Sequence, residues 1–236
     1  MAKDVIIALD FPGESDALSF LEKLGSLRPY VKIGMELFYA AGPQIVSRIK
    51  ERGHKVFLDL KLHDIPNTVA RAAGVLSKLG ADMLNLHAAG GSSMMRAALD
   101  AVTRPDGSRP LLIAVTQLTS TSQDVLRKEL LIDETLETAV LGYARLANES
   151  GLDGVVCSAL EAETIHRSVS DSFLTVTPGI RFADSAKDDQ VRIVTPLRAR
   201  ENGSDYIVVG RPITSSADPE EAYLRCCSAF LEGKNE

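Results

Sequence analysis

The sequence predicts an α/β protein that folds as a single (β/α)8 barrel over residues 1–236. Eight short apolar runs recur along the chain, and longer amphipathic segments separate them. The runs are rich in Val, Ile and Leu and lack polar alternation, as expected of parallel strands buried on both faces. Eight strand–helix repeats in a chain of 236 residues indicate a TIM barrel, in which each helix returns the chain to the next strand.

The strand and helix positions follow from these two patterns. The predicted strands are Val5–Leu9, Tyr30–Ile33, Lys55–Leu60, Met83–Leu86, Leu111–Val115, Gly154–Val156, Phe173–Thr177 and Tyr206–Val209. The predicted helices are Ser15–Leu27, Pro43–Arg52, Pro66–Leu79, Ser92–Val102, Leu136–Glu149, Ala159–Arg167, Asp188–Arg200 and Pro219–Leu231. Ser15 is a candidate N-cap for the first helix, and Gly53, Gly80 and Gly151 follow three others as candidate C-terminal stops.

An open, doubly wound sheet is the alternative fold. Its dinucleotide-binding signature is a glycine-rich G-x-G-x-x-G segment after the first strand. Here Leu9 is followed by Asp10-Phe11-Pro12-Gly13, which does not match. The longest irregular stretches, Gln117–Asp133 and Arg181–Asp189, both follow strands, so the barrel prediction puts them at its mouth as candidate lids.

Composition excludes some classes of function. The chain has 26 basic and 32 acidic residues and a formal charge of −6, which argues against a nucleic-acid binder. No apolar stretch approaches the ~20 residues that span a bilayer, so no membrane association is expected. Three cysteines, two of them adjacent, make a poor disulfide framework, and we expect a reducing, cytoplasmic location.

Charged residues gather where the predicted strands end, which is where such barrels build their active sites. Asp59 and Lys61 are two positions apart, so their side chains point to the same side of a strand. Asp64 lies just beyond them, and Asp10 and Lys32 come from the two preceding strands. An isolated Asp–Lys pair is more often a structural ion pair, but five converging charges at the functional face favour chemistry.

A phosphate site is indicated after the last two strands, the usual position for this fold. Gly179 and Gly210 allow backbone N–H groups to approach an anion, and Arg211 offers several donors to phosphate oxygens. Arg181 and Gln190 belong to the preceding loop and are placed to close over the anion. A Gly–Arg pair alone is weak support, since Gly210 could serve only as a turn residue.

These residues form a recognisable pattern. Asp59-x-Lys61-x-x-Asp64-Ile65-Pro66-Asn67-Thr68 resembles the signature of the orotidine 5′-monophosphate decarboxylase family. The D-x-K-x-x-D core is shared with related sugar-phosphate enzymes, whereas the Ile-Pro-Asn-Thr extension is more specific. The resemblance covers nearly the whole chain and also includes Ala8-Leu9-Asp10, Val31-Lys32-Ile33-Gly34, Leu118-Thr119-Ser120, Thr177-Pro178-Gly179-Ile180-Arg181, Asp189-Gln190 and Val209-Gly210-Arg211-Pro212.

The resemblance implies a reaction that uses neither a metal nor an organic cofactor. Lys61 would lie beside C6 of the pyrimidine and supply the proton that replaces CO2. Asp59 would lie near the departing carboxylate. Lys32 and Asp10 would hold the ribose hydroxyls and complete the charged network.

The resemblance also implies substrate-binding and partner residues. Asp64, Ile65 and Thr68 would reach the active site of a second subunit, making the enzyme a homodimer with shared sites. The remaining residues would bind the nucleotide: Thr119 the base, Gln190, Gly210, Arg211 and Arg181 the phosphate, and Pro178 with Val155 the side that receives CO2.

Two rival functions remain open on sequence grounds. A metal-dependent decarboxylase or aldolase of sugar phosphates would use carboxylates such as Asp59 to hold Mg²⁺, but Lys32 and Lys61 between the carboxylates favour the metal-free reaction. A non-catalytic nucleotide-binding protein would not need Lys61. His54 and His166 are expected on the surface.

Overall fold

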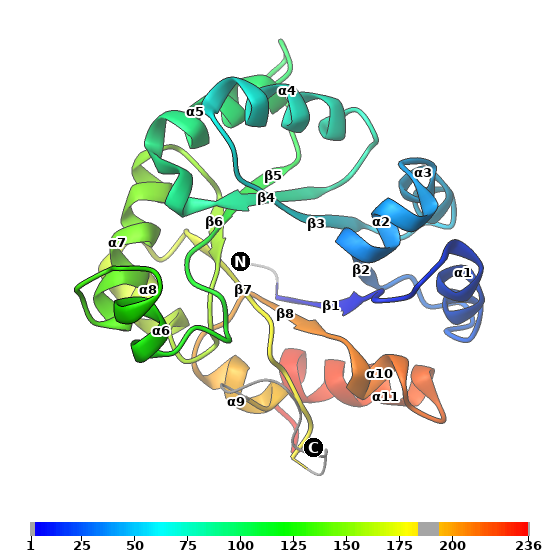
Figure 1. Ribbon diagram of the computed structural model, residues 1–236. Helices are drawn as coiled ribbons and strands as arrows, with labels where there is room; N and C mark the ends of the chain where they lie inside the picture. Colours follow the sequence, from blue (N-terminus) through cyan, green and yellow to red (C-terminus); the bar gives the residue numbers. More distant parts are fainter. Residues whose placement is uncertain (1–2, 184–193, 236) are drawn as a thin grey trace.

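The computed structural model of the protein describes residues 3–183 and 194–235. Eight parallel strands close into a barrel in chain order, with β8 pairing back to β1 (Figure 1). This confirms the predicted (β/α)8 fold. The strands are β1 Asp4–Ala8, β2 Tyr30–Gly34, β3 Val56–Leu62, β4 Met83–His87, β5 Leu111–Val115, β6 Gly154–Val156, β7 Leu174–Thr177 and β8 Tyr206–Val209.

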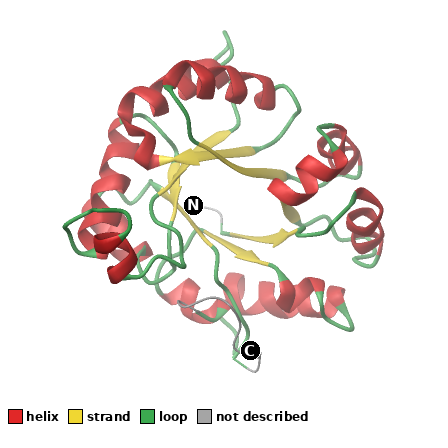
Figure 2. Ribbon diagram, viewed as in Figure 1, coloured by secondary structure: helices red, strands yellow, loops and turns green. Residues whose placement is uncertain are grey.

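Helices surround the barrel on its outer side (Figure 2). The α-helices are α1 Glu14–Glu22, α2 Met35–Ala41, α3 Gln44–Glu51, α4 Pro66–Ser77, α5 Gly91–Val102, α6 Gln123–Lys128, α7 Leu136–Glu149, α8 Ala162–Ser168, α9 Pro196–Glu201, α10 Arg211–Thr214 and α11 Pro219–Cys227. A 3-10 turn, Ala88–Gly90, follows β4, and a π-helical turn, Ser228–Glu232, continues α11. Across the described residues, every helix is too short or too polar to span a lipid bilayer.

The helix predictions were wrong in several places. The helix expected over Asp188–Arg200 begins only at Pro196, with Thr195 as its N-cap, and Val194 forms a β-bridge instead. The first helix begins at Glu14 with Gly13 as its N-cap, so Ser15 is not the cap. Helices α2 and α10 follow β2 and β8 directly and are too short to show an amphipathic period. The stretch 117–133 is not wholly irregular, since Ser122 caps α6 by accepting a hydrogen bond from the backbone N–H of Val125.

Apolar packing occurs in two layers separated by the strands. One cluster fills the barrel interior, and a larger one lies between the barrel and its helices. Leu58 and Leu60 belong to the outer cluster, so the intervening Asp59 faces inward, as the strand period predicted. The inner cluster consists of Ile6, Ala8, Tyr30, Phe57, Met83, Ile113, Val176 and Val208.

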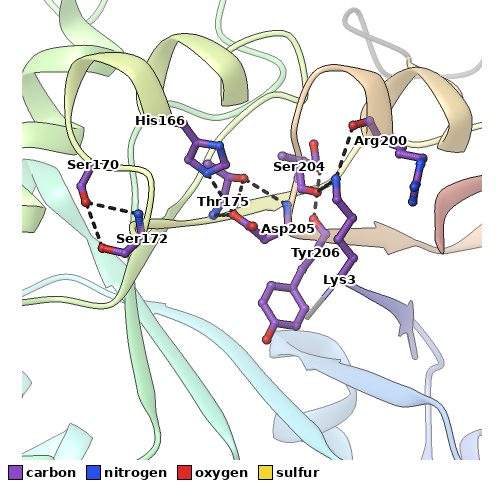
Figure 3. A network of polar contacts seen from close by, with 10 residues as sticks. Lys3, His166, Ser170, Ser172, Thr175, Arg200, Ser204, Asp205 and Tyr206 are labelled. Atoms are coloured by element: carbon purple, nitrogen blue, oxygen red, sulfur yellow. Dashed lines mark hydrogen bonds and ion pairs between the residues drawn. The ribbon is translucent and has the colours of Figure 1, made fainter. Parts of the chain in front are cut away.

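Three aspartates tie neighbouring strands together at the amino-terminal end of the barrel. Asp82, Asp153 and Asp205 each precede an even-numbered strand, and each carboxylate accepts the N–H of a residue on the strand before. Each carboxylate also binds a cationic or protonatable side chain: Lys50, Arg109 and His166, respectively. Figure 3 shows the third set, in which Asp205 lies between His166 and Thr175.

Candidate active site

Polar side chains from adjacent strands meet at the opposite, carboxyl-terminal end of the barrel. Asp10 follows β1, Lys32 lies on β2, and Asp59 and Lys61 lie on β3. Strand register aligns them, because Ala8 pairs with Lys32 and Gly34 pairs with Asp59. Four of the five charges predicted to converge therefore do so, and the fifth, Asp64, does not join them.

The four side chains form a chain of alternating charge. Lys32 Nζ lies 3.0 Å from Asp10 Oδ1 and 3.4 Å from Asp59 Oδ2. Lys61 Nζ lies 2.7 Å from Asp59 Oδ1. Gly34 makes room for this arrangement, because a Cβ there would lie 3.1 Å from Lys32 Nζ. The order is Asp10, Lys32, Asp59, Lys61, with the last ammonium at the open end.

Burial and pairing act in opposite directions on the two inner members of this chain. Burial disfavours the charged form of Asp59, but Lys32 and Lys61, with hydrogen bonds from Lys61 and Asn85, outweigh it and lower the pKa of Asp59. Burial likewise disfavours the Lys32 ammonium, but Asp59 and Asp10 outweigh it and raise its pKa. Both groups therefore stay charged near neutral pH.

The backbone of Lys61 departs from regular strand geometry. Its φ is 50°, in the left-handed region that non-glycine residues seldom adopt. The register between β3 and β4 shifts between Leu58 and Leu62, so the ladder is interrupted at this point. The Asn85 side chain replaces the missing strand contact, since its Oδ1 accepts the N–H of Lys61 at 2.8 Å.

A cavity of about 230 Å³ opens beside the charged chain. Lys32, Asp59 and Lys61 line one part of it, and Thr119 and Pro178 line another. The contacts expected of Thr119 with the base and of Pro178 with the departing CO2 stay predictions. Phe57, Val115, Val156, Val176 and Val208 make the rest of the wall largely apolar.

A second cavity adjoins the first, because Lys32, Pro178 and Val208 line both. Arg181, Gly210 and Arg211 contribute to its wall, which agrees with the predicted phosphate site. Thr214 and Ser215 add hydroxyl groups that sequence reasoning did not anticipate. Gly179 also lines it with φ 85°, a conformation that favours glycine. Gln190 lies outside the described residues.

Three predicted site residues lie apart from these cavities. Asp64, Ile65 and Thr68 are exposed on the segment that leaves β3 and begins α4. Across residues 3–183 and 194–235, the Asp64 carboxylate has no ion-pair partner, and its Oδ1 accepts only the N–H of Ile65. Their expected role in a second subunit's site remains a prediction.

The structure corrects one expectation and adds one residue. Val155 does not line the cavity: it is fully buried in the outer cluster, and Val156 faces inward in its place. The position that the family resemblance implied for Val155 is therefore wrong by one residue on β6. Asn85 was missed, although a lone amide in the apolar segment Met83–Leu86 was a visible signal. Within the described part of the chain, no three His, Cys, Asp or Glu side chains form a metal-binding group.

Comparisons with known proteins give a consistent result. The family model described as "Orotidine 5'-phosphate decarboxylase / HUMPS family" matches residues 3–226. The chain is 57% identical over 226 residues to an orotidine 5′-phosphate decarboxylase of Bacillus cytotoxicus, covering 94% of this chain and 95% of the relative. It is 56% identical, with the same coverage, to one of Bacillus cereus.

Solved structures agree with these sequence matches. The crystal structure of orotidine 5′-phosphate decarboxylase from Lactobacillus acidophilus is 46% identical, with a TM-score of 0.87, and the match covers 97% of this chain and 99% of the other. An uncharacterized conserved protein from Geobacillus kaustophilus is 49% identical, with a TM-score of 0.84, over 96% of this chain and 99% of the other. The sequence resemblance is thereby confirmed, and the chain belongs to the orotidine 5′-phosphate decarboxylase / HUMPS family.

Proposed function

We propose that this protein decarboxylates orotidine 5′-monophosphate to uridine 5′-monophosphate and CO2, in de novo pyrimidine biosynthesis. The observation that carries the proposal is the alternating chain Asp10–Lys32–Asp59–Lys61, which ends in an ammonium group beside a largely apolar cavity. The family membership supports the same reaction. The protein acts as one catalytic domain over residues 1–236, in the cytoplasm, on a small nucleotide.

The two adjoining cavities match the two ends of a nucleotide. The phosphate binds near Gly210, Arg211 and Arg181, joined by Gln190 from the loop. The pyrimidine occupies the apolar cavity, where Thr119 contacts the base and Pro178 lines the side on which CO2 leaves. Between them, Asp10 and Lys32 hold the ribose hydroxyls.

The charged chain supplies what the bond cleavage needs. When the C6–carboxylate bond breaks, its electron pair stays on C6 in the plane of the ring, where the π system cannot delocalise it. The Lys61 ammonium stabilises this carbanion electrostatically and then transfers a proton to C6, while CO2 departs. Asp59, 2.7 Å from Lys61 Nζ, directs the ammonium towards C6, and its negative charge faces the leaving carboxylate. No electron acceptor or metal is required.

A second copy of the chain completes each site. The side chains of Asp64, Ile65 and Thr68 are exposed where α4 begins, and Ile65 is an apolar side chain with 67% of its area in solvent. Leu118, Leu130 and Leu131 are further exposed apolar residues on the β5–α7 segment at the same end of the barrel. A homodimer buries these apolar groups and brings Asp64 of one subunit to the charged chain of the other.

The test is a decrease in orotidine 5′-monophosphate absorbance on adding the purified protein in the presence of a chelator. The expected result is full conversion to uridine 5′-monophosphate with release of CO2. The rival, a metal-dependent enzyme acting on sugar phosphates, predicts loss of turnover on chelation and recovery with Mg²⁺. The charges disfavour this rival, because the Asp59 carboxylate is already matched by two ammonium groups. Absence of turnover under both conditions would rule out the proposed reaction.

A further inference from the structure

We propose that Asn85 is a positioning residue, which sets the Lys61 ammonium in its reactive place by holding both the backbone of Lys61 and the carboxylate of Asp59. This inference deepens the proposed function and rests on it. Asn85 lies on β4 beside the interruption in the β3–β4 ladder, and only 1% of its area is exposed. It therefore has no solvent partners to compete with its contacts on β3.

The two ends of the amide make different contacts. Asn85 Oδ1 accepts the N–H of Lys61 at 2.8 Å, and Asn85 Nδ2 donates to Asp59 Oδ1 at 2.7 Å. Reversing the amide would set its NH2 against an N–H and its oxygen against a carboxylate. The two partners thus fix a single orientation, and in that orientation one side chain links the Lys61 backbone to the Asp59 carboxylate.

These contacts compensate for an unfavourable backbone conformation. A non-glycine residue at φ 50° is disfavoured unless its surroundings hold it there. With the regular ladder absent at this point, the Asn85 acceptor is the contact that holds the Lys61 N–H. Asp59 Oδ1 receives both the Asn85 amide and Lys61 Nζ, so one oxygen joins the amide to the reactive ammonium.

The isosteric variant Asn85→Asp separates this role from simple packing. The new carboxyl group would face Asp59 within hydrogen-bond distance, and the negative charge of Asp59 raises the pKa of the new group. Only the protonated form can donate to Asp59 while accepting from Lys61, as the amide does. The other ionisable side chains near this position are Lys61 and His63 on or after β3, Lys32 on β2 and His87 at the end of β4, whereas β5 is apolar. Because the parent protein contains the same groups, the ratio of the variant's kcat to the parent's kcat at each pH reports only the titration of the new carboxyl group.

The experiment measures kcat and KM for orotidine 5′-monophosphate, and Kd for uridine 5′-monophosphate, in the parent, Asn85→Leu and Asn85→Asp. Asn85→Leu is expected to lower kcat by about 10- to 100-fold with little change in Kd. For Asn85→Asp, the kcat ratio to parent should rise as the pH falls from about 8 to about 5. Thr175→Val is the matched control, since it also removes a buried donor to an aspartate (Thr175 Oγ1 to Asp205 Oδ2, 3.0 Å), but at the far end of the barrel. It should retain the parent kcat.

Several outcomes would overturn the inference. One is a folded Asn85→Leu protein with parent kcat, and another is a loss of product binding that equals the loss of turnover. If Asn85→Leu does not fold, a pH-independent ratio for Asn85→Asp overturns it. If the parent is active and substitution of Asn85 leaves kcat unchanged, only the positioning role is contradicted. If the parent shows no turnover, the proposed function and this role are contradicted together.

Discussion

Lys61 Nζ lies 2.7 Å from Asp59 Oδ1, although the backbone between the two residues is not a regular strand. The left-handed φ of Lys61 falls within the register shift between Leu58 and Leu62, and yet the two side chains still meet. Asp59 has a second cation in Lys32, 3.4 Å away. The carboxylate is therefore shared, and among residues 3–183 and 194–235 the Lys61 ammonium at the cavity has Asp59 as its ion-pair partner.

Replacing Lys61 by Ala should abolish turnover and preserve the fold. Asp59 would keep Lys32 and Asn85 as partners, so its buried charge would remain compensated. We expect kcat for orotidine 5′-monophosphate to fall by at least about 10³-fold, because the group that stabilises and protonates the carbanion is gone. Lys50→Ala is the matched control: it removes a lysine from an ion pair, with Asp82, at the opposite end of the barrel. Near-parent turnover in Lys61→Ala would remove Lys61 from the central role.

Replacing Arg211 by Ala should weaken catalysis only for substrates that carry a phosphate. The loss of a charged donor predicts a decrease in kcat/KM of about 10- to 100-fold for orotidine 5′-monophosphate. The nucleoside orotidine lacks the phosphate, so its much slower turnover should not change. Arg198→Ala serves as the control, since Arg198 pairs with Glu201 on the outer helix α9. An equal decrease for both substrates would show that Arg211 acts on something other than the phosphate.

Two inactive variants should restore activity when they are combined in one dimer. In a shared-site dimer, Lys61→Ala and Asp64→Asn subunits form one site with both changes and one site with neither. Random exchange of subunits then yields about a quarter of the parent activity from two proteins that are inactive alone. Heterodimers that form but show no recovered activity would exclude shared sites, as would an Asp64→Asn variant with parent turnover.

Much of this architecture was accessible from the sequence because its causes are local. A parallel strand buried on both faces must be apolar along its length, so a charged residue such as Asp59 at its carboxyl end is conspicuous. The barrel rule then directs all eight strand ends to one face. Those two steps predicted the contact between Asp59 and Lys61 and the grouping of Gly210 with Arg211.

The features that were missed depend on pairings between strands, which no local pattern specifies. Asn85 acquires its role only because β4 lies beside the interruption in β3. Val155 was carried over from the family resemblance, and the three-residue strand β6 offers too little alternation to check which face it occupies. His54 and His166 were expected on the surface, but His54 is 3% exposed and binds the Pro29 carbonyl oxygen, and His166 is half-buried against Asp205.

Chelation should leave activity unchanged. Asp10 and Asp59 are the carboxylates that line the two cavities, and each has an ammonium group within 3.4 Å. A divalent cation would have to displace those lysines, and it prefers sites richer in carboxylates. Turnover is measured after dialysis against a chelator and again after adding Mg²⁺. Loss of activity that Mg²⁺ restores would indicate a metal-dependent reaction instead.

Stability should depend on pH through the His166–Asp205 pair at the amino-terminal end of the barrel (Figure 3). The hydrogen bond from His166 Nε2 to Asp205 Oδ2, at 3.1 Å, outweighs burial and raises the pKa of His166. Burial of Asp205 opposes its ionisation, but His166 and Thr175 more than offset this and lower its pKa, so the carboxylate is charged at neutral pH. The pair is therefore a charged hydrogen bond whenever His166 is protonated.

The direction of this pH dependence follows from the linkage between proton binding and folding. A histidine with a raised pKa in the fold stabilises the folded state fully below its unfolded pKa of ~6.5, and this contribution is lost as the pH rises through the folded pKa. Compared with His166→Gln, the parent should be more stable by about 1.5 kcal/mol at pH ~5.5, or roughly 3–6 °C in Tm for a protein of this size. The difference should shrink towards pH ~8.5. Burial lowers the pKa of His54 and His87, so those groups act in the opposite direction in both proteins and cancel in the comparison. A Tm difference that grows with pH would contradict the assigned pairing, because it would mean that His166 is stabilised in its neutral form.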